Sequence, residues 1–213
     1  MNTIFYNGDI EDTYIDAILK EIYREKVYDR FLLGKKDLTI VEVGANIGLV
    51  SQYLSRFSKQ VFAIEPSEQH FQCLKKLIKE NKLENITPIN KALSDKVESV
   101  TFYHNQNSTM FSMNGAVNDG TEAEVVEAVD MHTLFIQNKI DKVDFMKLDV
   151  EGSEFDVLVS PGFERVVGNI DSILIEYHTW TQRNPNQLFD ILKNYGFKPF
   201  QVPAEATLIG GKK

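Results

Sequence analysis

The residues best suited to bind a ligand come directly after an apolar run at residues 39–43. Gly44 and Gly48 follow this run, and a second apolar run at residues 60–64 ends in an acid, Glu65. Glycines have no Cβ, so the backbone can approach a ligand closely, and a carboxylate can accept hydrogen bonds from both hydroxyls of a ribose. The pattern therefore indicates a nucleoside ligand at the carboxyl edge of a parallel sheet.

The spacing of the glycines distinguishes between nucleoside cofactors. A dinucleotide fingerprint has glycines at relative positions one, three and six, where this chain has Gly44, Asn46 and Leu49. Instead, the acid Glu42 precedes a Gly-x-Asn-x-Gly turn that ends at Gly48. This pattern resembles the first motif of S-adenosylmethionine-dependent methyltransferases, whose ligand is a cationic sulfonium without a pyrophosphate. The alternative for the motif alone is a strand and turn of some other α/β protein.

A second group of polar residues follows two later apolar runs: Asp149 and Glu151, then Glu176 and His178. Methyl transfer to an alcohol requires groups that position the acceptor and take its proton. We expect Asp149, Glu176 and His178 to carry this chemistry, because an imidazole titrates near neutral pH and Asp149 ends its strand beside the expected cofactor. The alternatives are an ordinary loop histidine and helix capping by Asp149 and Glu151.

Carboxylates at strand ends can also bind hard divalent cations, which makes Asp149, Glu151 and Glu176 an alternative Mg²⁺ site. Acidic strand ends are common without a metal, and we expect none here. The single cysteine, Cys73, excludes a cysteine metal site and an internal disulfide. Three further histidines lack partners at ligand spacing and are expected at the surface or in packing: His70, His104 and His132.

Alternating strands and helices must position these residues. The hydrophobic pattern predicts core strands at residues 38–43, 60–64, 86–90, 143–149 and 172–177. It predicts helices at residues 12–33 (with a break near Arg24), 48–57, 67–81, 131–138, 153–159 (ended by Pro161 and Gly162) and 186–195. Ligands of such sheets lie beyond the carboxyl ends of the strands, where the polar and glycine clusters converge.

Further strands are expected outside this alternating pattern. Residues 98–103 and 124–130 alternate like half-exposed antiparallel strands, and a polar loop at residues 104–121 joins them. Residues 197–202 and 206–209 are expected to form a closing antiparallel pair. The fold class is therefore α/β, with a mostly parallel sheet and helices on both faces.

Length and composition favour one domain, residues 1–213, with an N-terminal helical cap at residues 1–34 and a sheet core at residues 38–213. The net charge of −8 argues against a nucleic-acid partner, because phosphate binding needs clustered Lys and Arg. No apolar stretch approaches a membrane span or a signal peptide, so we expect a cytoplasmic protein without a membrane partner. The N-terminal helix could close over the cofactor or pair with a second subunit as a homodimer.

Four segments in order, residues 41–48, 63–66, 90–95 and 145–154, resemble the FkbM-like family of S-adenosylmethionine-dependent methyltransferases. The resemblance implies a Rossmann-like class I methyltransferase fold with seven strands, an antiparallel closing strand and S-adenosylmethionine as cofactor. Two features depart from the family pattern: the first-motif acid is Glu42, where Asp is frequent, and residues 108–113 match only loosely.

The resemblance also implies roles for individual residues. Gly44, Asn46 and Gly48 would wrap the methionine moiety, and Glu65 would hold the ribose. The remaining cofactor contacts implied by the match are Glu42 in the first motif, Pro66 beside Glu65, Asn90 and Ala92 along the adenine, and Asp149.

The expected function is methylation of a hydroxyl on a sugar or another small metabolite, so the expected partner is a small hydroxylated acceptor. Two alternatives remain. One is a non-catalytic module that binds the cofactor, and the other is a nucleotide- or NAD-binding enzyme on a related fold, which Asn46 and Leu49 disfavour.

Overall fold

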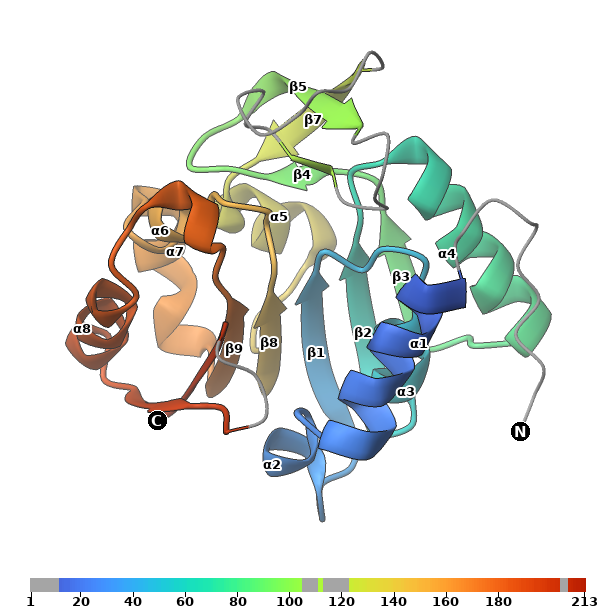
Figure 1. Ribbon diagram of the computed structural model, residues 1–213, viewed down its shortest axis with the longest axis horizontal. Helices are drawn as coiled ribbons and strands as arrows, with labels where there is room; N and C mark the ends of the chain where they lie inside the picture. Colours follow the sequence, from blue (N-terminus) through green and yellow to red (C-terminus); the bar gives the residue numbers. More distant parts are fainter. Residues whose placement is uncertain (1–11, 105–110, 113–122, 204–206) are drawn as a thin grey trace.

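The computed structural model describes residues 12–104, 111–112, 123–203 and 207–213, and a seven-stranded sheet organises it (Figure 1). In spatial order the strands are β10 (Lys198–Gln201), β11 (Leu208–Lys212), β9 (Ser172–Glu176), β8 (Phe145–Leu148), β1 (Leu38–Val43), β2 (Ser58–Ile64) and β3 (Ile86–Ile89). The strands from β9 to β3 are parallel to their neighbours, whereas β11 is antiparallel to both β9 and β10. The expected α/β class and the antiparallel closing strand are confirmed.

Helices cover both faces of this sheet, because its central strands are apolar on both sides. One face packs Val41, Met146 and Ile173 against a layer of helices: α5 (Met131–Asn138), α6 (Glu154–Leu158), α7 (Pro161–Val166) and α8 (Asn186–Asn194). The opposite face packs Ile40 and Phe145 against the N-terminal segment and two further helices: α3 (Leu49–Ser55) and α4 (Glu68–Asn81).

The N-terminal segment forms three short helices in place of one helix at residues 12–33. They are α1 (Asp12–Lys20), the π-helical turn η1 (Glu21–Glu25) and α2 (Asp29–Leu32). The break lies just after the expected position at Arg24, because Lys26 has a left-handed φ of 55° that ends η1. Ile22 and Phe31 are buried in the core on this face of the sheet.

A second, four-stranded sheet lies beyond the carboxyl ends of β1 and β2 in Figure 1. Its order is β4 (Ala92–Leu93), β7 (Ala123–Val129), β5 (Glu98–His104) and β6 (Phe111–Ser112). The antiparallel pairing of β5 with β7 confirms the alternation seen in the sequence, whereas β4 was not expected. Most of the predicted loop at residues 104–121 lies outside the described residues.

The helix predicted at residues 153–159 ends before Pro161, since α6 ends at Leu158, but the further helix that begins at Pro161 was not predicted. Pro161 begins α7, because a proline fits the first helical turn, and the Ser160 hydroxyl accepts the N–H of Phe163 as an N-cap. Two short 3₁₀ turns follow in this half of the chain: η3 (Val167–Asn169) and η4 (Thr179–Thr181). No helix within the described ranges is long and apolar enough to cross a membrane.

Gly44→Ala is expected to lower the free energy of unfolding by about 2–4 kcal/mol. Gly44 has φ +79°, and a Cβ there would lie 2.4 Å from the backbone oxygen of Asp149 on the neighbouring strand. Urea denaturation measures the change. Gly168→Ala is the control, because a Cβ at Gly168 meets no atom within 4 Å. Equal unfolding midpoints for the two variants would contradict the close approach.

Candidate functional site

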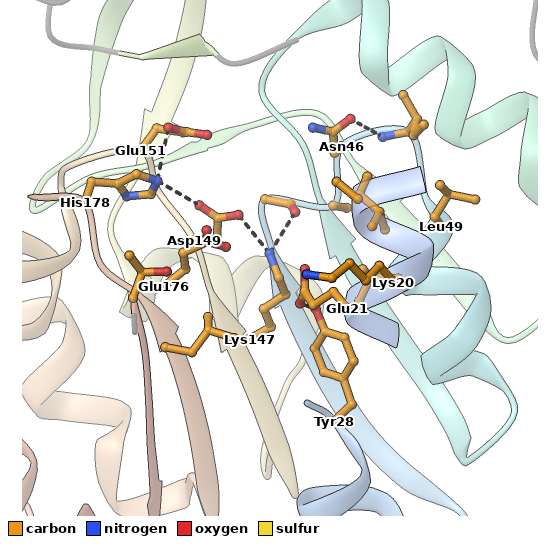
Figure 2. A pocket seen from close by; sticks show the side chains of 18 residues that line it. Lys20, Glu21, Tyr28, Asn46, Leu49, Lys147, Asp149, Glu151, Glu176 and His178 are labelled. Atoms are coloured by element: carbon orange, nitrogen blue, oxygen red, sulfur yellow. Dashed lines mark hydrogen bonds and ion pairs between the residues drawn. The ribbon is translucent and has the colours of Figure 1, made fainter. Parts of the chain in front are cut away.

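A cavity of about 300 Å³ lies at the carboxyl ends of β1, β8 and β9 (Figure 2). Six residues singled out from the sequence line it: Gly44, Asn46, Asp149, Glu151, Glu176 and His178. The N-terminal segment contributes Lys20, Glu21 and Tyr28 to the same cavity, and β8 contributes Lys147. The sequence thus predicted the strand ends that build this cavity, and it left open whether the N-terminal segment covers it; the structure places residues of that segment in the cavity wall.

Glu65 organises the glycine turn without lining this cavity. Its Oε2 accepts the N–H of Asn46 at 2.7 Å, and its Oε1 accepts the N–H of Ser67 at 2.9 Å. These bonds support the left-handed φ of 52° at Asn46 and connect the turn to the first residues of α4. Burial raises the pKa of Glu65 to about 8, although the two backbone N–H groups oppose that shift.

The other expected cofactor contacts near Glu65 lie at the edge of β2 and β3. Asn90 is exposed, and its amide donates to the backbone oxygens of Glu65 and Pro66, each at 3.0 Å. Ala92 is buried in β4, where its register partner is Ala128. His70 is also buried, and its Nδ1 lies 4.0 Å from Oε1 of Glu65, so it has a partner that its sequence context did not reveal.

Lys147 is a buried cation in the cavity wall, and no motif in the sequence pointed to it. Its Nζ donates to Oδ2 of Asp149 at 2.9 Å and to the backbone oxygen of Gly44 at 3.4 Å. Glu42, fully buried beside it, is its register partner on β1. The available signal was a lysine inside a strand whose other residues are apolar, because a buried ammonium requires carboxylate partners.

The side chains around Lys147 carry more negative than positive charge. Burial lowers the pKa of Lys147, but the carboxylates of Asp149, Glu176, Glu42 and Glu21 raise it well above its usual range. Burial raises the pKa of Glu42 to about 7 against the opposing effect of Lys147. Burial and Asp149 together raise the pKa of Glu176 to about 7. A cationic ligand would therefore be favoured in this cavity.

His178 faces three carboxylates. Its Nδ1 lies 2.8 Å from Oε1 of the fully buried Glu154, and its Nε2 lies 3.2 Å from Oε2 of Glu151 and 3.9 Å from Oδ1 of Asp149. Burial lowers the pKa of His178, but the hydrogen bond to Glu154 and the charges of Glu151 and Asp149 raise it to about 9. Glu154 is a further functional candidate that the sequence analysis did not select.

The turn after β8 gives these acids their positions. Glu151 and Gly152 have left-handed φ values of 50° and 102°, and the N–H of Gly152 donates to Oε1 of Glu154 at 3.0 Å. Oδ2 of Asp149 accepts from Lys147, and no group among the described residues donates to its buried Oδ1. Asp149 therefore does not cap α6, which excludes the capping alternative for this residue.

Asp149, Glu151 and His178 offer ligand atoms that all lie within 4.8 Å of one another, a set that could hold a metal ion. The set differs from the carboxylate site considered from the sequence, because His178 takes the place of Glu176. In the structure, the imidazole itself lies against the carboxylates as their cationic partner.

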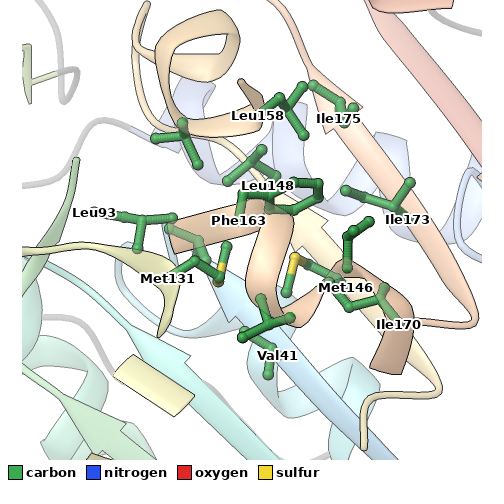
Figure 3. Close-up of a cluster of buried hydrophobic side chains, with 14 of the residues drawn as sticks. Val41, Leu93, Met131, Met146, Leu148, Leu158, Phe163, Ile170, Ile173 and Ile175 are labelled. Carbon is green, nitrogen blue, oxygen red and sulfur yellow. The ribbon is translucent and has the colours of Figure 1, made fainter. Parts of the chain in front are cut away.

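An apolar cluster supports the cavity wall from the opposite face of the sheet (Figure 3). Leu148 and Ile175, which precede the polar strand ends of β8 and β9, are fully buried there with Leu158 and Phe163. The strand residues alternate between this cluster and the polar face, so Lys147 and Glu176 point to the cavity side. The site therefore lies on rigid, well-packed elements.

Lys147→Met is expected to lower the free energy of unfolding by about 3–5 kcal/mol, because it leaves buried carboxylates without their ammonium partner. Urea denaturation at neutral pH measures this loss. Lys142→Met is the matched control, since Lys142 pairs with Asp171 at an exposed position. An effect no larger than that of the control would show that Lys147 does not hold the cluster together.

A comparison with protein-family models identifies a methyltransferase domain over most of the residues that build this site. Residues 42–199, well over half of the chain, match the model of the methyltransferase FkbM domain family. A search of curated proteins found no significant match.

Several solved structures share the fold. A precorrin-6y C5,15-methyltransferase from Geobacter metallireducens is 12% identical, with 89% of this chain and 87% of that chain covered and a TM-score of 0.54. A SAM-dependent methyltransferase from Aquifex aeolicus is 15% identical, with 95% and 97% covered and a TM-score of 0.50. SMU.1697c from Streptococcus mutans, solved in complex with SAH, is 11% identical, with 89% and 95% covered and a TM-score of 0.50. With the matched domain, the shared fold and the glycine turn beside an acidic cavity, the chain belongs to the FkbM family of S-adenosylmethionine-dependent methyltransferases.

Proposed function

We propose that this methyltransferase acts on a hydroxyl group of a sugar or another small metabolite, with His178 as the general base. The observation that carries the proposal is the position of the imidazole. Its Nδ1 is held at 2.8 Å by the buried Glu154, and its Nε2 lies on the side of the cavity, 3.2 Å from Oε2 of Glu151 and 3.9 Å from Oδ1 of Asp149. A histidine fixed in this way by a carboxylate can take a proton from an acceptor alcohol.

The residues of the cavity fit the cofactor. When bound, S-adenosylmethionine supplies an electrophilic methyl group on a sulfonium. The buried Oδ1 of Asp149, which accepts no hydrogen bond among the described residues, is a suitable partner for a positive charge. Gly44 and Asn46 give a backbone surface for the methionine moiety. Glu42 accepts a hydrogen bond from the hydroxyl of Ser51 in α3, and Gly48 lies close to Leu74 of α4, so both connect the turn region to the helices.

We assign the ribose hydroxyls to Glu65. Each of its two carboxylate oxygens accepts one backbone N–H, and a carboxylate oxygen has two lone pairs, so each oxygen can accept one more hydrogen bond. Asn90 and Pro66 adjoin Glu65 at the edge of the sheet, in the direction in which the adenine would extend. Ala92 belongs to the same proposed adenine region, although its side chain is buried in β4.

The proton transfer requires a neutral His178. Its pKa of about 9 keeps most of the imidazole protonated at neutral pH before ligands bind. A cation in the cavity lowers this pKa, because it disfavours a second positive charge nearby. Asp149 and Glu176 would orient the acceptor hydroxyl, and Glu154 holds the ring in the tautomer that leaves Nε2 ready to accept the proton.

The acceptor is proposed to be small and not a nucleic acid. The net charge of the chain is −8, and the cavity adds a local excess of carboxylates that would repel phosphates. Hydroxyl groups are good partners for such carboxylates, because they donate hydrogen bonds without carrying charge.

The test is an assay of S-adenosylhomocysteine release with sugars, glycosides and hydroxylated metabolites as acceptors. A product heavier by one methylene group, with the methyl on oxygen, supports the proposal, whereas a methyl on nitrogen overturns it. Cofactor binding without turnover on any acceptor would favour the non-catalytic module. Loss of activity in EDTA that Mg²⁺ restores would assign Asp149, Glu151 and His178 to a metal ion, and would end the role of His178 as base.

The pH dependence of the reaction rate should show whether His178 is the general base. In the wild-type protein with the cofactor bound, kcat/KM for the acceptor is expected to rise with pH and to level off below about 9, because the cationic cofactor lowers the pKa of His178 from about 9 and only deprotonated His178 can accept a proton. Glu154→Gln removes the carboxylate that raises this pKa, so the rise should move to lower pH. His178→Gln should lower kcat by about 100-fold or more.

Asp156→Asn is the matched control for Glu154→Gln. Asp156 lies in the same helix, but it is exposed and pairs with Arg183. Its pH profile should coincide with that of the wild-type protein. A wild-type kcat/KM that is flat across this pH range would contradict base catalysis by His178.

Glu65→Ala is expected to weaken S-adenosylhomocysteine binding by roughly 1.5–3 kcal/mol, the magnitude of charge-assisted hydrogen bonds, when the titration is run above pH 8, where Glu65 is ionised. Isothermal titration measures the affinity, with the exposed Glu68→Ala as control. An analogue without the 2′-hydroxyl separates ribose contacts from distortion of the turn. The wild-type protein should prefer the hydroxylated ligand, and the Glu65 variant should not. An equal preference in both proteins would leave Glu65 with a structural role alone.

A further inference from the structure

The wall of the cavity formed by the N-terminal segment lies outside the part of the chain that matches the family. The matched domain begins at residue 42, whereas Lys20, Glu21 and Tyr28 precede it and line the cavity. The family comparison therefore gives these three residues no role. Lys20 forms an ion pair with Glu25, which leaves Glu21 and Tyr28 as the groups to explain.

Glu21 is held in place by two features. It begins η1, a π-helical turn that follows α1, and such turns redirect side chains relative to a regular helix and often occur at functional sites. The hydroxyl of Tyr28, a residue with no exposed surface, donates a hydrogen bond to Oε1 of Glu21. A carboxylate that is fixed in this way at a cavity wall is prepared to bind a cation.

The carboxylate of Glu21 has a positively charged neighbour, the ammonium of Lys147. Figure 2 shows Glu21 beside Lys147, on the side of that lysine away from Glu176 and His178. The ammonium of Lys147 also contacts the backbone oxygen of Gly44, the first residue of the glycine turn. A carboxylate and an ammonium at one end of the cavity, next to a backbone carbonyl, match the opposite charges of an α-amino acid group. The cofactor of this family carries such a group on its methionine moiety.

We propose that Glu21 binds the α-ammonium group of the cofactor, and that Tyr28 positions the Glu21 carboxylate for this contact. The backbone oxygen of Gly44 accepts from the same ammonium, and Lys147 faces the α-carboxylate. The N-terminal segment is then a part of the cofactor site. This assignment concerns cofactor binding and is independent of the acceptor and of the base.

The test compares two ligands by isothermal titration without any acceptor. S-adenosylhomocysteine carries the amino-acid tail, and 5′-methylthioadenosine lacks it. Glu21→Gln should weaken binding of S-adenosylhomocysteine about tenfold and leave binding of 5′-methylthioadenosine unchanged. Tyr28→Phe should give a smaller loss in the same direction, because the carboxylate remains but is less well fixed.

Asp16→Asn is the matched control, since it removes one exposed carboxylate from the same segment at a position that does not line the cavity. It should leave the affinities for both ligands unchanged. Retained binding of 5′-methylthioadenosine by Glu21→Gln also shows that this variant is folded. An equal loss for both ligands, or no loss for either, overturns the proposal.

Discussion

The buried ammonium of Lys147 is the constraint on which the arrangement of the site depends. Carboxylates approach it from β1, from the end of β8, from the end of β9 and from η1, and none of these could be buried so close to the others without a cation among them. The lysine therefore fixes more than the adjacent Asp149. The N-terminal segment packs on this face of the sheet through apolar residues such as Ile22 and Phe31, and it brings Glu21 into the same cluster.

A second buried carboxylate, Glu65, acts on the opposite side of the glycine turn. It accepts the N–H of Asn46 and that of Ser67, so it links the turn to the start of α4. Gly44 is constrained from the other direction by the backbone of Asp149. The turn is thus fixed between β2 and β8 before a ligand arrives, which lowers the entropy that binding must overcome.

The sequence predicted the sheet well, because the relevant signals are local. The range of β1 and the glycine turn after it follow from an uninterrupted apolar run and the residue types that end it. The position of Asp149 directly after a strand was equally accessible. Glu21 and Glu154 were not, because their importance comes from partners that are distant in sequence: Lys147 and His178. Hydrophobic periodicity does not encode such contacts between charges. The start of α7 at Pro161 was missed for a different reason: the cap formed by Ser160 is a local signal that the periodicity does not contain.

The register of β1 against β8 has a consequence for how this sequence can change over evolutionary time. Glu42 and Lys147 are register partners in a buried layer, so replacing the lysine alone leaves a carboxylate without its counter-charge, and replacing the glutamate alone alters the charge balance of the cavity. Neither charge can be lost by itself, although one acid can replace another at position 42. Among homologues, the acid at position 42 and the lysine at position 147 should therefore be kept together or lost together.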